Sequence, residues 1–433
     1  MPLMMGSVTS SDLLNLMRTI SPILNPFTFL SNAISALDLA LTAPHYWKLV
    51  VVNLVIHILL ALQAAIALTW KLLRKHDGER AKCWFWRQRH VFATQRRPYY
   101  EPNGNQLLQL CQLVGCICLE IYYAFLYRVT KISAISYSNY GTAAFWFTLS
   151  HLPGIMGFWF ASWSALYLVL LCPQRYEISP TSKKNSVWSP LVMNWLCIGL
   201  PILLVLFFCV LGVVLIMQTH NLSANLTILK STLAELDSMW TPVQQLEPRT
   251  IELLSYPLEN LFQTTRHLIQ CYQSIAFSWA IMSMLMLSFY CITMAAIWKI
   301  LHNTLMVASG KAPVMVKIEK EIEKQNESIG SAIEDITQVK RHVSSIPLPD
   351  EPRKVLNPAL ASQLRRNYYF LSVSCTLMAT SLACNIFFGL LLGVKVKSGI
   401  DIQAGNTTFA LCTSGSLLSS MSLLLQSVAC MIS

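Results

Sequence analysis

Long stretches without charged side chains recur along this chain. Seven of them cover residues 49–70, 107–127, 143–172, 187–217, 271–298, 368–394 and 407–431, and Glu120 is their only Asp, Glu, Lys or Arg. A helix needs ~20 apolar residues to cross the hydrocarbon core of a bilayer. Charged residues make up 12% of the chain, against about 25% in soluble domains. The sequence predicts an all-α integral membrane protein with a seven-helix bundle in residues 47–433.

The positive residues divide unevenly between alternate loops. The loops at 71–106, 173–187 and 299–366 hold 23 of the 32 Lys and Arg residues, and the other set holds the remaining nine. Positive charge is retained on the cytoplasmic side of a membrane. We therefore expect the N-terminus outside and the C-terminus inside.

Glycosylation sequons agree with this orientation. Asn221 and Asn225 fall between the fourth and fifth stretches, and Asn406 precedes the seventh, all on the predicted outer face. Asn326 falls on the inner face and should stay unmodified. Because sugar is added only on the lumenal side, Asn221, Asn225 and Asn406 are predicted N-glycosylation sites of a glycoprotein.

Residues 1–46 are interpreted as an outer segment that lies partly at the membrane interface as an amphipathic helix. Residues 27–43 are apolar, but they are few for a span and include Asp38. An eighth span in this segment is the alternative. A signal peptide is not expected, because no positive cluster precedes an apolar core with a cleavage site.

The outer loop at 218–270 is long enough to cover the mouth of the bundle. Its apolar residues follow a helical spacing in two groups: Leu226, Leu229, Leu233 and Leu236, then Ile251, Leu254, Leu258, Leu261 and Phe262. We predict two short amphipathic helices joined around Pro242 and Pro248. They form either a ligand lid or partner surface, or simply a folded glycosylated loop.

The inner loop between the fifth and sixth stretches contains a heptad pattern in residues 314–345. Its seam consists of Ile318, Ile322, Gln325, Ile329, Ala332, Ile336, Val339 and Val343. Such spacing is typical of a coiled-coil helix. The apolar seam of residues 318–343 has three alternative partners: the inner end of the bundle, a second copy of the chain, or a cytoplasmic protein.

The first inner loop, 71–106, mixes aromatic residues with positive ones, among them Trp84, Trp86, Arg87, Arg96 and Arg97. This mixture suits an anionic leaflet, where indole rings settle at the level of the headgroups. Nucleic-acid binding is not expected of such a short loop at a membrane. The net charge of +11 follows from the retention of positive charge inside.

Ionisable residues inside a membrane are costly and often mark a site. Glu120, His151 and His57 form the candidate intramembrane polar site, and the depth of Glu120 and His151 in the spans allows a contact between them that would orient a polar ligand. A structural hydrogen bond is the alternative role. Motifs of zinc enzymes, intramembrane aspartyl enzymes and serine hydrolases are absent from the sequence. We therefore expect no enzyme activity, no cofactor and no metal.

The layout resembles that of G-protein-coupled receptors. Gln174-Arg175-Tyr176 resembles the acidic residue, Arg and Tyr after the third span of rhodopsin-like receptors, with Gln174 in place of the acid, and Asn53 resembles their span-one asparagine. The seventh stretch lacks Asn-Pro-x-x-Tyr and the sixth lacks Cys-Trp-x-Pro, so the resemblance is one of layout.

This layout predicts a receptor in the plasma membrane or another secretory-pathway membrane that senses an external ligand of unknown identity. Coupling to a cytoplasmic partner would involve Arg175, Ile322, Ile329 and Ile336. A transporter, a channel or a membrane scaffold that uses the heptad helix is the alternative. A change of Arg175 should uncouple a receptor, whereas a scaffold should fail only when the three isoleucines become polar.

Overall fold

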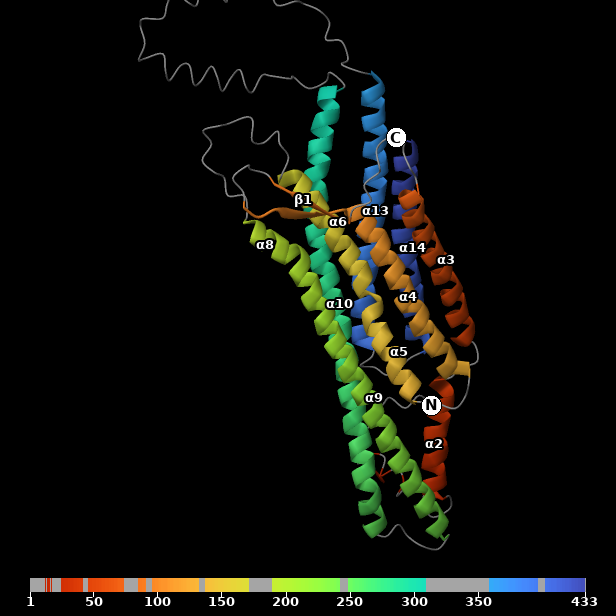
Figure 1. Ribbon diagram of the computed structural model, residues 1–433. Helices are drawn as coiled ribbons and strands as arrows, with labels where there is room; N and C mark the ends of the chain where they lie inside the picture. Colours follow the sequence, from red (N-terminus) through yellow and green to blue (C-terminus); the bar gives the residue numbers. More distant parts are fainter. Residues whose placement is uncertain are drawn as a thin grey trace, which may run out of the picture. The chain divides into compact units, whose positions relative to one another are not determined.

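The computed structural model describes residues 25–41, 46–73, 85–90, 96–131, 137–170, 189–241, 248–308, 358–395 and 402–432, together with Asp12, Leu14, Asn15 and Met17 (Figure 1). The chain divides into two compact units. The first consists of Met1–Met294 and Cys375–Leu424, and the second of Ala295–Ser374 and Leu425–Ser433. The first unit contains the stem, the bundle and the sites described below.

The described part is almost entirely helical. In chain order its helices are α2 (Pro26–Leu41), α3 (Tyr46–Leu73), α4 (Gly104–Lys131), α5 (Tyr137–Ser150), α6 (Leu152–Leu170), α8 (Pro190–Asn194), the π-helix η1 (Trp195–Gly199), α9 (Leu200–Met239), α10 (Pro248–Ala308), α13 (Pro358–Lys395) and α14 (Ile402–Ile432). Strands β1 (Trp86–Arg89) and β2 (Tyr99–Pro102) form a two-stranded antiparallel sheet in which Trp86 pairs with Pro102.

Six helical segments of the described residues are long and apolar enough to cross a membrane. They are Trp47–Trp70, Gly104–Val129, Tyr140–Leu170, Pro190–Met239, Arg249–Met306 and Ser362–Val394. They match the first six predicted stretches, so the protein is a multi-pass membrane protein. The seventh stretch lies in α14, where the apolar segment Ala410–Leu425 is shorter. Seven spans and their orientation stay predictions.

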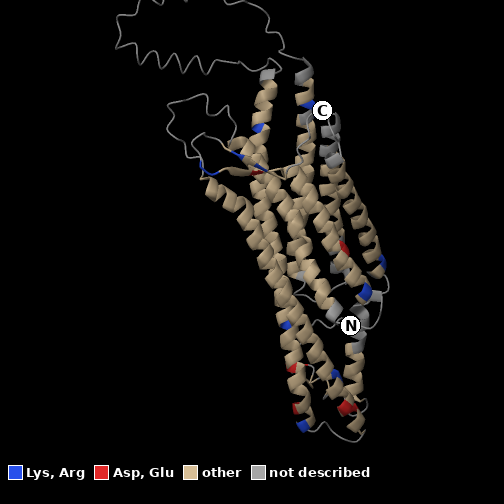
Figure 2. Ribbon diagram, in the orientation of Figure 1, with Lys and Arg blue, Asp and Glu red and all other residues tan. Residues whose placement is uncertain are grey.

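The outer surfaces of these helices are apolar, as expected of side chains that face lipid. Val52, Leu59 and Ile66 of α3 are exposed, as are Leu206 and Val210 of α9. In Figure 2 the middle sections of α3 and α9 carry few charged residues. Exposure of such a continuous apolar surface to water costs free energy, whereas contact with lipid tails does not.

Helices α9 and α10 extend beyond the predicted spans as uninterrupted helices. Two separate short helices were predicted in the outer loop, but α9 continues to Met239 and α10 begins at Pro248. No Gly or Pro occurs between residues 213 and 241, so nothing in the sequence ends α9 earlier. At 1.5 Å per residue, its 40 residues reach about 60 Å, twice the hydrocarbon thickness of ~30 Å.

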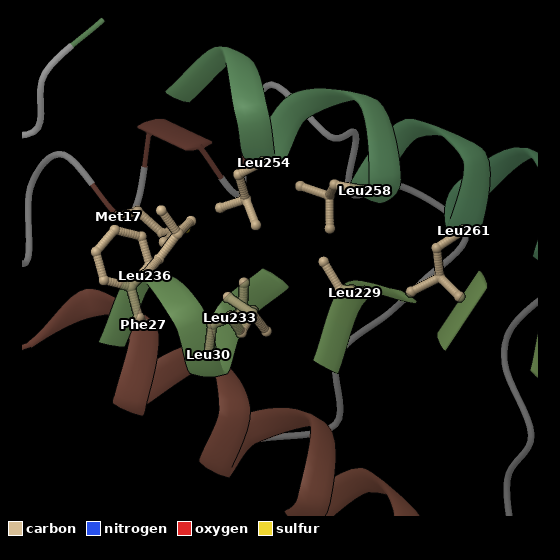
Figure 3. Close-up of a cluster of buried hydrophobic side chains, with 9 residues drawn as sticks. All are labelled: Met17, Phe27, Leu30, Leu229, Leu233, Leu236, Leu254, Leu258 and Leu261. Carbon is tan, nitrogen blue, oxygen red and sulfur yellow. The ribbon is translucent and has the colours of Figure 1, made fainter. Parts of the chain in front are cut away.

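These extensions form a helical stem together with α2. We define the stem as α2 with residues 222–239 of α9 and 248–262 of α10. Its core consists of eight buried residues of these helices together with Met17, which precedes α2 in the chain. The nine side chains point toward one another in Figure 3: Met17, Phe27, Leu30, Leu229, Leu233, Leu236, Leu254, Leu258 and Leu261. The leucines that the sequence assigned to helical faces thus meet each other across the stem.

Polar contacts attach α2 to α9 within the stem. Asp237 accepts hydrogen bonds from Asn25 Nδ2 at 2.5 Å and from Thr28 Oγ1 at 2.6 Å. Asn25 Oδ1 in turn accepts from the Phe27 backbone N–H at 3.0 Å and caps the helix. The 16 residues of α2 are few for a span. The segment that the sequence placed at the membrane interface therefore contacts protein along its buried face.

The third predicted span is divided by a turn at His151, where α5 ends and α6 begins. Pro153 follows directly in the first turn of α6, where the missing N–H of proline costs no hydrogen bond. The turn places the His151 ring between helices, beside Trp279 and Phe388. The aromatic core around it also contains Phe147 and Phe208.

A π-helical turn precedes α9 and has a cause in the sequence. Pro201 has no N–H to donate to the carbonyl of Cys197 four residues earlier. The Trp159 indole Nε1 donates to that carbonyl at 3.0 Å instead. The neighbouring helix α6 therefore supplies a donor to this carbonyl of η1.

The described part of the second unit consists of the end of α10, the beginning of α13 and the end of α14. Trp298 and Tyr368 stack there with ring centroids 5.9 Å apart. The predicted heptad helix lies outside the described residues.

Candidate functional site

The polar face of α14 contacts three neighbouring helices of the bundle. On the α3 side, Thr413 Oγ1 donates to Asn53 Oδ1, and Ser416 Oγ lies 3.3 Å from His57 Nε2. Gln63 Nε2 donates to the Ser420 carbonyl at 3.0 Å. Three side chains of α3, spaced over ten residues, thus contact three residues of α14.

His57 is oriented by its own helix. Its Nδ1 donates to the Asn53 carbonyl at 2.8 Å, which directs Nε2 toward Ser416. The imidazole is fully buried, and the Tyr123 ring lies 5.4 Å away, centroid to centroid. His57 therefore sits inside the bundle rather than against lipid.

Helices α4 and α13 bind the other side of α14. Gln112 Nε2 of α4 donates to Ser420 Oγ at 3.4 Å. Ser381 Oγ of α13 donates to the Gly415 carbonyl at 2.8 Å and lies 2.9 Å from Ser419 Oγ. Hydrogen bonds between membrane helices fix their relative rotation. Two serines of α14, Ser419 and Ser420, take part in these contacts.

A small polar cavity lies among α4, α6, α13 and α14. Its volume is about 40 Å³. Cys and Gly residues, Leu119 and Phe158 complete a lining whose polar members are Gln112, Ser150, His151, Ser381, Asn385, Ser416 and Ser419. By volume it can hold about three water molecules at most. Drug-sized ligands need about 300 Å³ or more. The cavity suits water or a similarly small polar species.

His151 is the residue of the predicted site that lines this cavity. Its Nε2 lies 4.0 Å from the Cys412 sulfur, and its ring centroid is 4.7 Å from those of Trp279 and Phe388. Aromatic rings therefore enclose the imidazole on one side, while the cavity lies on another. The side chain of His151 connects the aromatic core to the polar face of α14.

The structure does not bring Glu120 and His151 together. No hydrogen bond or ion pair joins the two side chains, both of which belong to the described residues. Glu120 is half-buried and does not line the cavity. The contact that their depth allowed is not formed, because depth along a helix fixes height but not the direction in which a side chain points.

Several members of the site were not predicted from the sequence, among them Gln112 and Ser381. Both are neutral polar residues in apolar helices, so no charge marks them. The available signal was spacing, since Gln112 and Cys116 lie four residues apart and both line the cavity. Among the described residues, no group of three or more His, Cys, Asp or Glu side chains is arranged to hold a metal ion.

Two of the predicted glycosylation sites are described. Asn221 is exposed on α9, whereas Asn225 is half-buried and its Nδ2 donates to Thr264 Oγ1 at 2.8 Å. Asn221 is therefore the more accessible acceptor in the folded stem. The structure does not describe the side chain of Asn406 or the residues Arg175, Ile322, Ile329 and Ile336.

Comparison of the chain with protein-family models, with curated proteins and with solved structures finds no match. The function must therefore be argued from the site and the fold alone.

Proposed function

We propose that this multi-pass membrane protein is a receptor in which the stem binds an external ligand and transmits that event to the bundle. The observation that supports the proposal is the continuity of α9 and α10 from the stem core into the bundle core. The proposal places the protein in the plasma membrane or another secretory-pathway membrane. It includes no catalytic role. The signal would pass to a cytoplasmic partner through residues 318–343 and Arg175.

Continuous helices transmit displacement because their backbone hydrogen bonds resist bending. A shift of α9 against α10 in the stem would move Phe208 and Trp279, which stack in the bundle with centroids 6.5 Å apart. Trp279 contacts His151, and His151 lies beside Cys412 of α14. This chain of contacts offers a route from the stem to the polar face of α14.

The proposal can be tested with an antibody fragment against the stem as the probe. The full chain is labelled with 5-fluorotryptophan and embedded in lipid nanodiscs, and the Trp279 signal is assigned by its loss in Trp279→Phe. We expect binding of the fragment to shift the ¹⁹F signal of Trp279, because the stem and this ring share two helices.

Two glycines inserted between His220 and Asn221 should interrupt α9 and reduce the shift, because only α10 then remains continuous, although the fragment still binds. The same insertion between Trp240 and Thr241, beyond the end of α9, should leave the shift intact. A Trp279 signal that is insensitive to the fragment in the unmodified protein contradicts the proposal.

The polar cavity favours a second candidate function, the passage of water-sized solutes through the bundle. Its lining offers neutral hydrogen-bonding groups and His151 at a depth where such groups are otherwise rare. A pathway through the bundle would form if the residues around the cavity moved and extended it toward both ends of the bundle.

Gly154→Val tests this candidate, since Gly154 lines the cavity and no atom lies within 4 Å of an added Cβ. If the protein conducts, liposomes that contain it should pass water or protons faster than empty liposomes, and Gly154→Val should remove that excess. Gly141→Ala is the control. Gly141 does not line the cavity, and a Cβ added there lies 3.6 Å from Thr219. Flux equal to that of empty liposomes eliminates this candidate.

A further inference from the structure

A groove of about 410 Å³ opens at the start of the α8–η1–α9 segment, at the opposite end of α9 from the stem. It is lined by Arg97, Pro98, Tyr100, Leu191, Asn194, Trp195, Ile198 and Gly199. We propose that this groove binds one anionic phospholipid of the adjacent leaflet, with its phosphate at Arg97 and an acyl chain along the π-helical turn.

The chemistry of the groove changes along its length. Leu191 and Trp195 are more than half exposed and, with Ile198, form an apolar wall. Arg97 lies on the opposing loop beside the strand β2. A lipid has the same division, since its charged headgroup is joined to an apolar chain. A soluble phosphate compound would leave the apolar wall uncovered.

The charge around the groove favours an anionic headgroup over a neutral one. The described residues 85–90 and 96–103 contain four arginines, Arg87, Arg89, Arg96 and Arg97, and one acidic residue, Glu101. Glu101 pairs with Arg89 at 3.6 Å. Arg96 and Arg97 are exposed, so a lipid phosphate can approach them. Arginine suits such a partner because its fork of donors matches phosphate oxygens.

The side chain of Asn194 joins the two walls of the groove. Its Nδ2 donates to the Pro98 carbonyl at 2.9 Å, and its Oδ1 accepts from the Tyr100 backbone N–H at 2.9 Å. The loop and the helix are thus fixed relative to each other before a ligand arrives, which reduces the entropy cost of binding. Trp195 also suits the lipid–water boundary, where indole rings are enriched.

Native mass spectrometry of the full chain in detergent provides the test. The protein is titrated with phosphatidylglycerol or phosphatidylcholine of identical acyl chains, and bound lipids are counted. We expect preferential binding of phosphatidylglycerol. Arg97→Gln should weaken it about fivefold, the factor that corresponds to ~1 kcal/mol for one basic group near an anionic surface. Trp195→Ala should weaken binding of both lipids, because the apolar wall contacts the acyl chain of either lipid.

Arg266→Gln is the matched control, since it removes one exposed positive charge from α10 far along the chain from the groove. It should leave lipid binding unchanged, and Arg97→Lys should retain most of it. Equal losses in Arg97→Gln and Arg266→Gln would overturn the proposal, because net charge alone would then explain binding. Displacement of the lipid by inorganic phosphate at equal concentration would overturn it too, since a soluble anion would then suffice.

Discussion

Leu254→Ala should destabilise the stem by about 2–5 kcal/mol, the usual cost of removing a fully buried leucine side chain. Leu254 has 0% exposure and packs in the stem core with Leu233 and Leu258. Truncation leaves a cavity between α9, α10 and α2 (Figure 3). Hydrogen exchange of the full chain in nanodiscs measures the effect, because stem amides exchange through local opening. We expect residues 225–239 to exchange at least about tenfold faster, since 1.4 kcal/mol is a factor of ten.

The neighbouring residue supplies the control. Leu253 is 63% exposed, so Leu253→Ala removes the same atoms from the surface of the same helix. Its effect should stay within about 0.5 kcal/mol, or a few-fold in exchange rate. Equal effects of the two substitutions would mean that the stem core does not hold these helices together. The receptor proposal would then lose its transmitting element.

The six long apolar helical segments could be predicted from the sequence because the signal is local. A run of ~20 residues without charge needs no knowledge of its neighbours to identify it as a span. The leucines of the stem were found for the same reason, since a spacing of three and four residues defines one face of a helix. Leu229 and Leu254 were each assigned to a buried face, and they do lie in one core.

What could not be predicted is which faces meet. Glu120 and His151 were compared by their depth in the spans, yet only His151 lines the cavity, and its ring neighbours include aromatic residues of α10 and α13. The β1–β2 sheet was also missed, because Trp86-Arg-Gln-Arg89 reads as a basic loop until its partner strand is known. Strand pairing is a long-range property, and a four-residue strand carries little local signal.

The continuity of α9 and α10 was within reach of the sequence but was overlooked. Pro242 and Pro248 were taken as marks of two separate short helices, although no helix breaker separates the fourth stretch from the first group of leucines. The change from an apolar to an amphipathic pattern indicates a change of surroundings rather than the end of a helix. A helix that leaves the bilayer needs polar side chains on one face only.

Gly389→Ala should destabilise the bundle, although alanine is the better helix former. A Cβ at residue 389 would lie 2.7 Å from the Ala276 carbonyl oxygen and 2.9 Å from the Ala280 nitrogen. These are backbone atoms, so α10 and α13 must separate to admit the methyl group. Overpacking of this kind costs about 1–3 kcal/mol, against a gain of about 0.5–1 kcal/mol from replacing a helical glycine. The midpoint of thermal unfolding in one detergent should therefore fall.

Gly154→Ala isolates the two effects, because an added Cβ there meets no atom within 4 Å. It keeps the gain in helix propensity without the clash, so its unfolding midpoint should stay or rise. Phe388, next to Gly389, packs on Trp279 and His151, and the methyl group at 389 should also move the ¹⁹F signal of Trp279. If Gly389→Ala were as stable as Gly154→Ala, α10 and α13 would separate without cost. The interface would then be deformable, and motion of the stem would reach α10 without being passed on to α13.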